Sequence, residues 1–272
     1  MPPVKHGSYL LCCIVCLSWS GFFLLNQTNS SSGTALVITT NAKVKAENNW
    51  TSQQVAKFPD RLLGTCSVNP LKEYAVKELN RCAKDPFLRT GLKLHFGNSD
   101  VDLLNPEHLA KLRALFRAAN QNQMAIVVHL RSNYTHRRPY GAQHAKSFLD
   151  NVLPEAPDVT VQIAHLAGAG GYDEPSVDQA LGVFLDALAN SDERTKNLYF
   201  DVSGVAGIGE WKEKTELIAS RIRQIGFDRV LFGSDGTPNF FAPREAWAAF
   251  QQLPLSDAQF EIIKRNAAPY FR

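Results

Sequence analysis

A chain of 272 residues is long enough for one complete α/β barrel, a fold that typically uses about 250 residues. Apolar residues make up 44% and charged residues 20%, which is an ordinary globular mixture. The formal net charge of +3 is small and evenly spread, so it gives no indication of a nucleic-acid partner.

Residues 9–25 form an apolar stretch with two interpretations. It follows Lys5 and precedes a polar loop at 26–34, which is the layout of an export signal. A barrel strand covered on both faces also reads as a continuous apolar run, and we favour this strand and a cytoplasmic protein. On the signal interpretation the chain is exported or anchored, and only then would it contact a membrane. Asn26 and Asn29 would then match glycosylation acceptors.

The five cysteines are unevenly distributed. Cys12, Cys13 and Cys16 lie in the apolar stretch, and Cys66 and Cys82 lie in the body of the chain. An odd number at these spacings does not indicate a disulfide framework, and no second C-x-x-C motif is present to form a zinc ribbon. We interpret the single C-x-x-C motif as small buried hydrophobic residues.

From residue 50 onward, short β-rich runs alternate with amphipathic stretches. One such stretch begins with Asn105-Pro106, a helix cap and a first-turn proline, and continues with Leu109, Leu112 and Leu115 at helical spacing. This alternation predicts a parallel sheet with right-handed crossovers, closed as a TIM-type (β/α) barrel, with an open doubly wound sheet as the alternative. The runs that we predict to be strands are 61–68, 90–96, 124–130, 159–166, 197–203 and 229–235.

Polar residues recur where these strands end, and in a barrel such ends converge on one mouth. Arg131 would share the inward face with His129 and could grip a substrate carboxylate. After His165 comes the turn LAGAGG, where Gly168 and Gly170 would let backbone N–H groups approach an anion or oxyanion. The residues at the predicted ends are Asn69, Lys93, His95, His129, Arg131, His165, Asp201, Ser203 and Asp235.

Each of these residues also has a structural interpretation. One histidine at a strand end is more often part of a hydrogen-bonded structure than a ligand, but His129, His165 and Asp235 together favour a functional site, since burying such groups costs desolvation unless they bind something. For Lys93, pairing with a neighbouring carboxylate and substrate binding are evenly balanced. For His95 we favour a structural role at the strand end. Histidines 108, 136 and 144 receive no role.

The motifs resemble those of the amidohydrolase-related family, which includes aminocarboxymuconate-semialdehyde decarboxylase. The resemblance runs from about Asn48 to Arg272, and the order and spacing of its pieces are more specific than any one piece. These pieces are ENNWTSQQVAKFPDRL, SVNPL, GLKLH, IVVHL, IAHLAGAGG, VLFGSD and NAAPYF. The corresponding division of the chain is an N-terminal segment over 1–47 and a barrel domain over 48–272.

The resemblance implies a barrel with one divalent metal ion, usually zinc. It implies that His129 binds this metal and that His165 acts as an acid or base or polarises the substrate. It further implies that Asp235 binds the metal and orients or deprotonates the attacking water, whose pKa falls to about 7 on a metal ion.

One feature of the family is absent from this sequence. The family's first strand carries His-x-His, which supplies two metal ligands, and no such pair occurs here. The segment CIVCLSWSGFF resembles the family's second strand, which is why we favour a strand over a signal and expect the first strand to be missing or altered. A catalytic zinc site normally has three protein ligands, so His129 and Asp235 alone fall short.

Three functions are therefore consistent with the sequence. The leading one is a metal-dependent hydrolase that acts on a small carbonyl substrate through metal-activated water, with the glycine turn at the oxyanion. The alternatives are non-oxidative decarboxylation of a small carboxylate, and a catalytically impaired barrel that binds a ligand or partner. The expected partner is a small molecule, and the sequence leaves open whether the chain forms a homo-oligomer.

Overall fold

The computed structural model describes residues 41–59, 62–131, 139–172, 175–206, 214–235 and 243–271. Its strands form one parallel sheet in which each strand pairs with the next along the chain. Each strand falls inside a run predicted from the sequence. The strands are β1 (Cys66–Ser67), β2 (Gly91–His95), β3 (Ala125–His129), β4 (Val161–Ile163), β5 (Leu198–Asp201) and β6 (Val230–Leu231).

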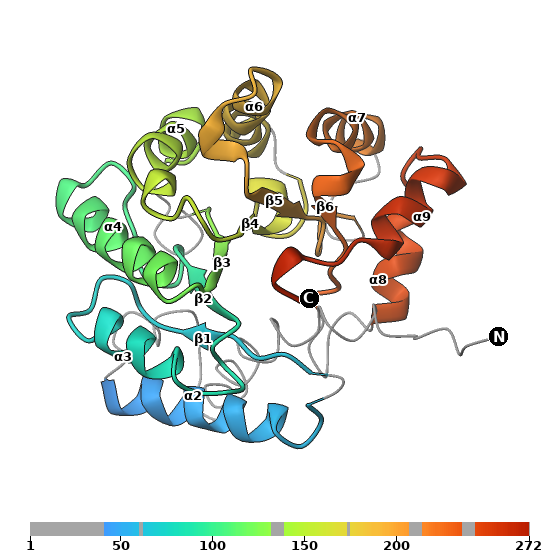
Figure 1. Cartoon of the computed structure of the whole chain (residues 1–272). Coiled ribbons are helices and arrows are strands. Elements are labelled where there is room, and N and C mark those ends of the chain that lie inside the picture. Colours follow the sequence, from blue (N-terminus) through green and yellow to red (C-terminus); the bar gives the residue numbers. More distant parts are fainter. Residues whose placement is uncertain are drawn as a thin grey trace, which may run out of the picture.

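The helices surround this sheet on its outer side, and Figure 1 shows them as an outer layer around the strands. A doubly wound sheet would carry helices on both faces, so this placement decides for the TIM-type barrel arrangement. The sequence did not indicate the first of these helices. They are α2 (Asn41–Val55), α3 (Ala75–Cys82), α4 (Pro106–Gln121), α5 (Ala142–Asn151), α6 (Ser176–Ala189), α7 (Thr215–Ile225), α8 (Pro243–Phe250) and α9 (Asp257–Arg265).

The register of the strands separates an apolar outer face from a polar inner face. Side chains alternate along a strand, and residues paired across parallel strands share a face. The residues on the inner face include Lys93, His95, His129, Gln162 and Asp201. The outward residues are fully or almost fully buried against the helices: Leu92, Leu94, Ile126, Val128, Val161, Ile163, Leu198 and Phe200.

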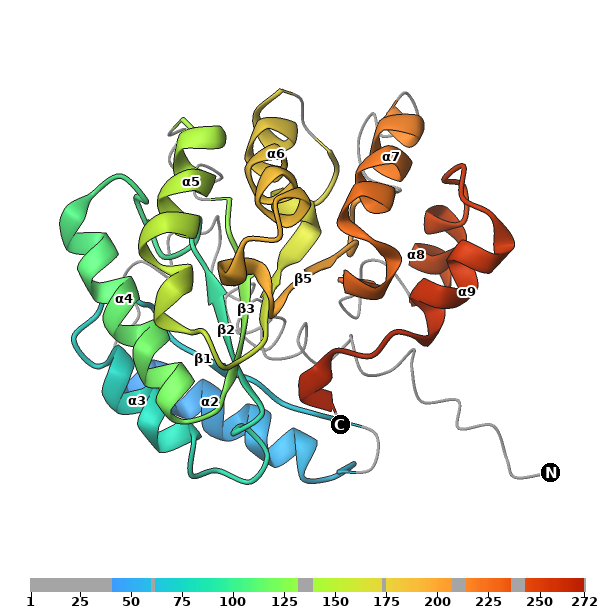
Figure 2. The same cartoon turned by 45° about the horizontal axis from the view of Figure 1, so that its top comes forward.

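Short hydrogen-bonded caps fix the ends of two helices. The side chain of Asn105 accepts hydrogen bonds from the backbone N–H groups of Glu107 and His108 before α4, which confirms the cap predicted there. Ser256 and Gln259 form a capping box before α9. After α9 the chain returns to the strands, as Figure 2 shows, and ends in the turn η7 (Pro269–Phe271).

A disulfide bond joins Cys66 to Cys82, with a Cα–Cα distance of 5.9 Å. The cysteine count did not indicate a disulfide framework, and that interpretation is wrong for this pair. The bond forms because Cys66 lies on the outer face of β1, directly beneath α3, where Cys82 is completely buried. Beside it the amide of Asn48 donates to Glu78 Oε1 at 2.8 Å and accepts from the Ser67 N–H at 2.9 Å, which ties α2 to the same place.

The apolar stretch at 9–25, interpreted above as a strand or a signal, lies outside the described residues. The proposed boundary between residues 47 and 48 falls within α2. Within the part of the chain that the structure describes, no helix has both the length and the apolar character needed to cross a membrane.

Candidate active site at the carboxyl ends of the strands

Three imidazoles meet where β2, β3 and β4 end. The rings of His95 and His129 are stacked, with centroids 3.8 Å apart and planes 12° apart. The ring of His165 lies edge-on to that of His129, with centroids 5.1 Å apart. His95 and His129 are partners in the register of β2 and β3, which places both rings on the inner face. The structure therefore brings together two histidines that the sequence singled out and one that it interpreted as structural.

Burial sets the charge of the stacked pair. It is the main cause that lowers the pKa of His95 and of His129 well below the usual value. After burial, the positive charge of Lys93 lowers the pKa of His95 most, and the neighbouring imidazole of His95 lowers that of His129 most. Both rings are therefore neutral at pH 7. The Nδ1 atom of His95 accepts a hydrogen bond from the backbone N–H of Asn98 at 3.0 Å. The Nδ1 atom of His129 is buried and has no hydrogen-bond partner among the described residues.

The backbone that carries His165 has an uncommon conformation. Strand β4 ends at Ile163, and the following turn η3 (Ala164–Ala167) contains three consecutive non-glycine residues with positive φ. These φ angles are 56° at His165, 48° at Leu166 and 66° at Ala167. Such residues cost of order 1–3 kcal/mol each and cluster at functional sites. The turn is held by a hydrogen bond from the Tyr140 hydroxyl to the Ala167 carbonyl at 2.7 Å.

The ring of His165 is fixed through its Nδ1 atom. This atom lies 2.5 Å from the carbonyl oxygen of Ser203 and 3.2 Å from the Ser203 hydroxyl. A carbonyl oxygen only accepts, so Nδ1 must carry the proton, and the lone pair of a neutral ring is then on Nε2. None of the described residues forms a hydrogen bond with Nε2. His165 therefore has a basic nitrogen, Nε2, at the carboxyl end of the barrel.

A buried carboxylate organises the backbone around this histidine. Asp201 ends β5, and its Oδ1 atom accepts from the N–H of His165 at 3.0 Å, the N–H of Ser203 at 3.1 Å and the Ser203 hydroxyl at 2.5 Å. Its Oδ2 atom accepts from Gln162 Nε2 at 2.7 Å. The sequence placed Asp201 and Ser203 at a strand end but assigned them no role. Tyr270 donates to Gln162 Oε1 at 2.5 Å; it lies in the NAAPYF motif but was assigned no role, and Gln162 was not singled out.

The residues predicted to bind substrate lie at this same end of the strands. Lys93 is on the inner face of β2 and is 8% exposed, whereas Arg131 follows β3 and is half-buried. Gly168 follows His165 in the turn, where an added Cβ would lie 3.0 Å from the His165 carbonyl oxygen. Gly170 has a φ of 86°, which favours glycine. The turn is sharply bent, and the role of Gly168 and Gly170 in letting backbone N–H groups approach an anion stays a prediction.

Asp235 lies four residues after β6, which pairs with β5, so it follows the strands at the same end as His129 and His165. It is half-buried and has a φ of 50°, a left-handed conformation that aspartate tolerates better than most residues. The structure thus places the predicted residues in the carboxyl-terminal halves of the strands or directly after them. It brings His129 and His165 into direct contact.

The amidohydrolase family model matches residues 24–271, which is most of the chain. The chain belongs to this amidohydrolase family. A comparison with curated proteins found no match. Solved structures similar to this amidohydrolase share 18% identity with it, and a likeness at that level shows the TIM-type barrel fold alone.

The first such structure is 5-carboxyvanillate decarboxylase LigW from Sphingomonas paucimobilis, with a TM-score of 0.58 over 87% of this chain and 74% of that chain. The second is 5-carboxyvanillate decarboxylase from Novosphingobium aromaticivorans, complexed with manganese and 4-hydroxy-3-methoxy-5-nitrobenzoic acid, with a TM-score of 0.55 over 86% of this chain and 71% of that chain. The third is 2,6-dihydroxybenzoate decarboxylase from Rhizobium, with a TM-score of 0.52 over 82% of this chain and 74% of that chain.

The described donors of this amidohydrolase do not fit a divalent metal by themselves. Within the described ranges, no three His, Cys, Asp or Glu side chains are placed to hold one ion. The parallel rings of His95 and His129 are stacked face to face, an arrangement that does not direct their nitrogens at a common point. A metal at this end would need donors from outside these ranges, since a catalytic site normally takes three protein ligands. The assignment of His129 and Asp235 as ligands stays a prediction.

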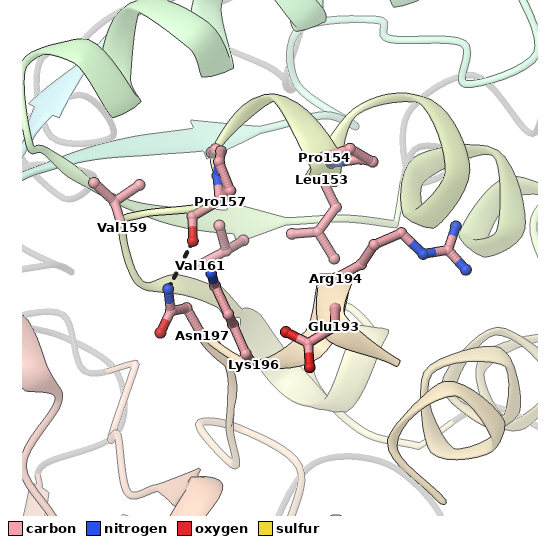
Figure 3. A pocket seen from close by; sticks show the side chains of 10 residues that line it. Leu153, Pro154, Pro157, Val159, Val161, Glu193, Arg194, Lys196 and Asn197 are labelled. Atoms are coloured by element: carbon pink, nitrogen blue, oxygen red, sulfur yellow. Dashed lines mark hydrogen bonds between the residues drawn. The ribbon is translucent and has the colours of Figure 1, made fainter. Parts of the chain in front are cut away.

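A cavity of about 200 Å³ lies away from the histidines, where β4 and β5 begin. Figure 3 shows Leu153, Val159 and Val161 around it, together with the hydrogen bond from Asn197 Nδ2 to the Pro157 carbonyl at 2.8 Å. TIM-barrel active sites lie at the opposite, carboxyl end of the strands. We therefore place the candidate site at the histidines and not in this cavity.

Proposed function

We propose that this member of the amidohydrolase family catalyses the non-oxidative decarboxylation of a small carboxylate, with His165 as the acid that protonates the product carbon. One observation carries the proposal: the Nδ1 proton of His165 is committed to the Ser203 carbonyl, which leaves Nε2 as the nitrogen that exchanges a proton. Decarboxylation breaks the bond between the carboxylate and its carbon, and carbon dioxide leaves. The electron pair remains on that carbon and takes a proton from Nε2 of the imidazolium form of His165, in which both ring nitrogens carry protons. This transfer leaves the neutral Nδ1–H ring, and solvent returns a proton to Nε2.

The neighbouring groups suit an anionic substrate. Lys93 is almost buried on the inner face, where a positive charge is costly unless an anion pairs with it. Arg131 follows the same end of the sheet and has the forked geometry that binds a carboxylate in a bidentate manner. The stacked neutral rings of His95 and His129 add donors and acceptors without adding charge. Two of the similar solved structures are named as decarboxylases, of 5-carboxyvanillate and of 2,6-dihydroxybenzoate, and these names support the same class of reaction.

Hydrolysis of a small carbonyl substrate is the second candidate, and the turn after β4 favours it. This turn contains three consecutive left-handed residues, and successive backbone N–H groups in such a turn can make a concave site for an anion or oxyanion. In that reaction Nε2 of His165 would accept a proton from the attacking water. The two reactions therefore use the same histidine in opposite directions of proton transfer.

Product analysis separates the two reactions. The full chain is incubated with a panel of small hydroxybenzoates and, in parallel, with lactones and esters of similar size. Carbon dioxide release and ester or lactone cleavage are measured, with His165→Gln as the control for each signal. Decarboxylation predicts carbon dioxide from the first panel only, lost in the variant. Cleavage of the second panel without carbon dioxide from the first would replace the proposal with hydrolysis.

A further inference from the structure

A continuous chain of hydrogen bonds runs from the C-terminal turn to the candidate acid. The Tyr270 hydroxyl donates to Gln162 Oε1 at 2.5 Å, and Gln162 Nε2 donates to Asp201 Oδ2 at 2.7 Å. Asp201 Oδ1 accepts from the Ser203 hydroxyl and from the backbone N–H groups of Ser203 and His165. The Ser203 carbonyl then accepts the Nδ1 proton of the His165 ring. Five residues from β4, η3, β5, the segment after β5 and η7 are joined in this way.

The order of donors along this chain is fixed by its chemistry. A carboxylate only accepts, so the Gln162 amide must turn its NH₂ toward Asp201 and its oxygen toward Tyr270. The Gln162 and Asp201 side chains are buried, at 3% exposure each, where an unmatched donor or acceptor costs about 1–3 kcal/mol. Each residue in the series can therefore form its hydrogen bonds in only one orientation. The amide introduced by Asp201→Asn could not accept on both of its sides.

We infer that Asp201, Gln162 and Tyr270 are positioning residues, which fix the left-handed turn of His165 and the direction of its ring through this chain of hydrogen bonds. The inference rests on the proposed role of His165. Asp201 holds the backbone of both His165 and Ser203, so it sets where the ring begins and where the carbonyl that takes Nδ1–H lies. Gln162 holds Asp201, and Tyr270 holds Gln162. The last residues of the chain thereby take part in the site.

The path of the chain explains how Tyr270 reaches the inner face. After α9, the Asn266 side chain donates to the carbonyls of Phe227 at 2.6 Å and Val230 at 2.8 Å, which anchors the returning segment at β6. Figures 1 and 2 both show this segment leaving the helix layer for the strand side. Tyr270 is therefore delivered to Gln162 by a segment with its own anchor.

The test exchanges the carboxylate of Asp201 and the amide of Gln162, which lie at the centre of the hydrogen-bond series. Asp201→Asn and Gln162→Glu should each lower kcat by about 10–100-fold, as expected for residues that orient a reacting group, with KM nearly unchanged. The double variant Asp201→Asn/Gln162→Glu restores the matching order of donors and acceptors, because the amide introduced at the first position can donate to the carboxylate introduced at the second. We expect its kcat to return to within about threefold of the original. A double variant no better than the single ones overturns the inference.

Tyr270→Phe removes only the terminal hydroxyl and should lower kcat about 2–10-fold. Tyr199→Phe is its matched control, because Tyr199 pairs with Gln162 in the register and shares the inner face, but no described residue accepts a hydrogen bond from its hydroxyl. The control should leave kcat unchanged. Equal effects of the two tyrosine variants would overturn the role of Tyr270.

A readout without substrate separates this inference from the proposed function. The ¹⁵N chemical shifts of the imidazoles, assigned with His165→Gln, report which ring nitrogen carries the proton. We expect His165 to be the Nδ1–H form in the original chain, mixed in Asp201→Asn, and Nδ1–H again in the double variant. The same tautomer in all three would overturn the inference, even if the chain decarboxylates. A shift as expected, without turnover of any carboxylate, would instead overturn the proposed function.

Discussion

Polar side chains at the two ends of the barrel differ in their burial and in their partners. At the amino end, charged side chains pair with one another at the surface, as Arg113 and Arg117 do with Glu155 at 2.8 and 2.7 Å. At the carboxyl end, Lys93 and His129 are buried on the inner face, and Nδ1 of His129 has no hydrogen-bond partner among the described residues. Paired surface charges stabilise a fold only slightly, whereas buried groups without partners are costly. The carboxyl end, where burial of polar groups is costly, is therefore the end to test for function.

The largest effect is expected at His165. His165→Gln keeps a polar side chain of similar size but cannot transfer a proton, so kcat/KM should fall by about 10²–10⁴-fold. The midpoint of thermal unfolding should change little, because the glutamine amide can also donate a hydrogen bond to the Ser203 carbonyl. Carbon dioxide release and thermal unfolding are measured on the same sample. Retained activity would show that the carboxyl end is polar for another reason.

Glu47, a buried carboxyl on helix α2, tests whether burial without a partner is costly elsewhere in the fold. Both carboxyl oxygens of Glu47 are buried and have no partner among the described residues, and burial raises its pKa from 4.5 to about 7 despite the opposing charge of Lys43. The folded chain thus holds a proton that the unfolded chain releases between these values. This contribution to stability is present below pH 4.5 and is lost as the pH rises to 7.

Glu47→Gln removes this titration. The difference in unfolding free energy between variant and original should move in favour of the variant by about 2–3 kcal/mol from pH 5 to pH 8, since one pKa unit corresponds to about 1.4 kcal/mol. Urea unfolding at the two pH values measures it. A difference independent of pH would mean that Glu47 titrates normally and that burial without partners is not costly in this fold.

Lys93 and Lys196 allow a direct test of the two ends. Lys93→Met should raise KM about 10–100-fold, because a hydrogen bond to a charged group contributes about 1.5–3 kcal/mol. Lys196 is exposed beside the cavity at the amino end, and Lys196→Met should leave KM unchanged. Steady-state kinetics on the preferred carboxylate measure both. Equal KM values for the two variants would remove Lys93 from the site.

The smallest effect is expected at Arg194, which pairs with Asp150 and Asp192 at the amino end. Its side chain is 36% exposed, so Arg194→Ala should cost at most about 1 kcal/mol of unfolding free energy and leave kcat/KM unchanged. Urea unfolding and the activity assay measure it. A loss of activity here would contradict the assignment of function to the opposite end.

The fold was predictable from the sequence because its signals are local. The alternation of β-rich and amphipathic stretches repeats along the chain, and the Asn105-Pro106 cap marks a helix start by itself. Helix α2 was not indicated, since its polar sequence NAKVKAENNWTSQQV has almost no amphipathic pattern and its place depends on contacts such as that of Asn48 with Glu78. The disulfide likewise depends on which face of β1 meets α3.

The site was predictable only in part. Strand ends predicted His129 and His165, because residues after parallel strands converge. The contribution of His95 depends on register, since pairing with His129 makes the rings stack. Gln162 and Tyr270 are 108 positions apart, and although Tyr270 lies in the NAAPYF motif, nothing in the sequence connects it to Gln162. A hydrogen bond between residues so far apart in the sequence becomes visible only when the barrel is assembled.

The bond between Cys66 and Cys82 has a practical consequence for all these measurements. Disulfides persist in oxidising compartments and are kept reduced in most cytosols, so the host chosen for production decides whether this crosslink is present. Batches from the two kinds of host are covalently different proteins with the same sequence. Counting free thiols before any comparison of variants therefore decides whether a shift in stability belongs to a substitution or to the host.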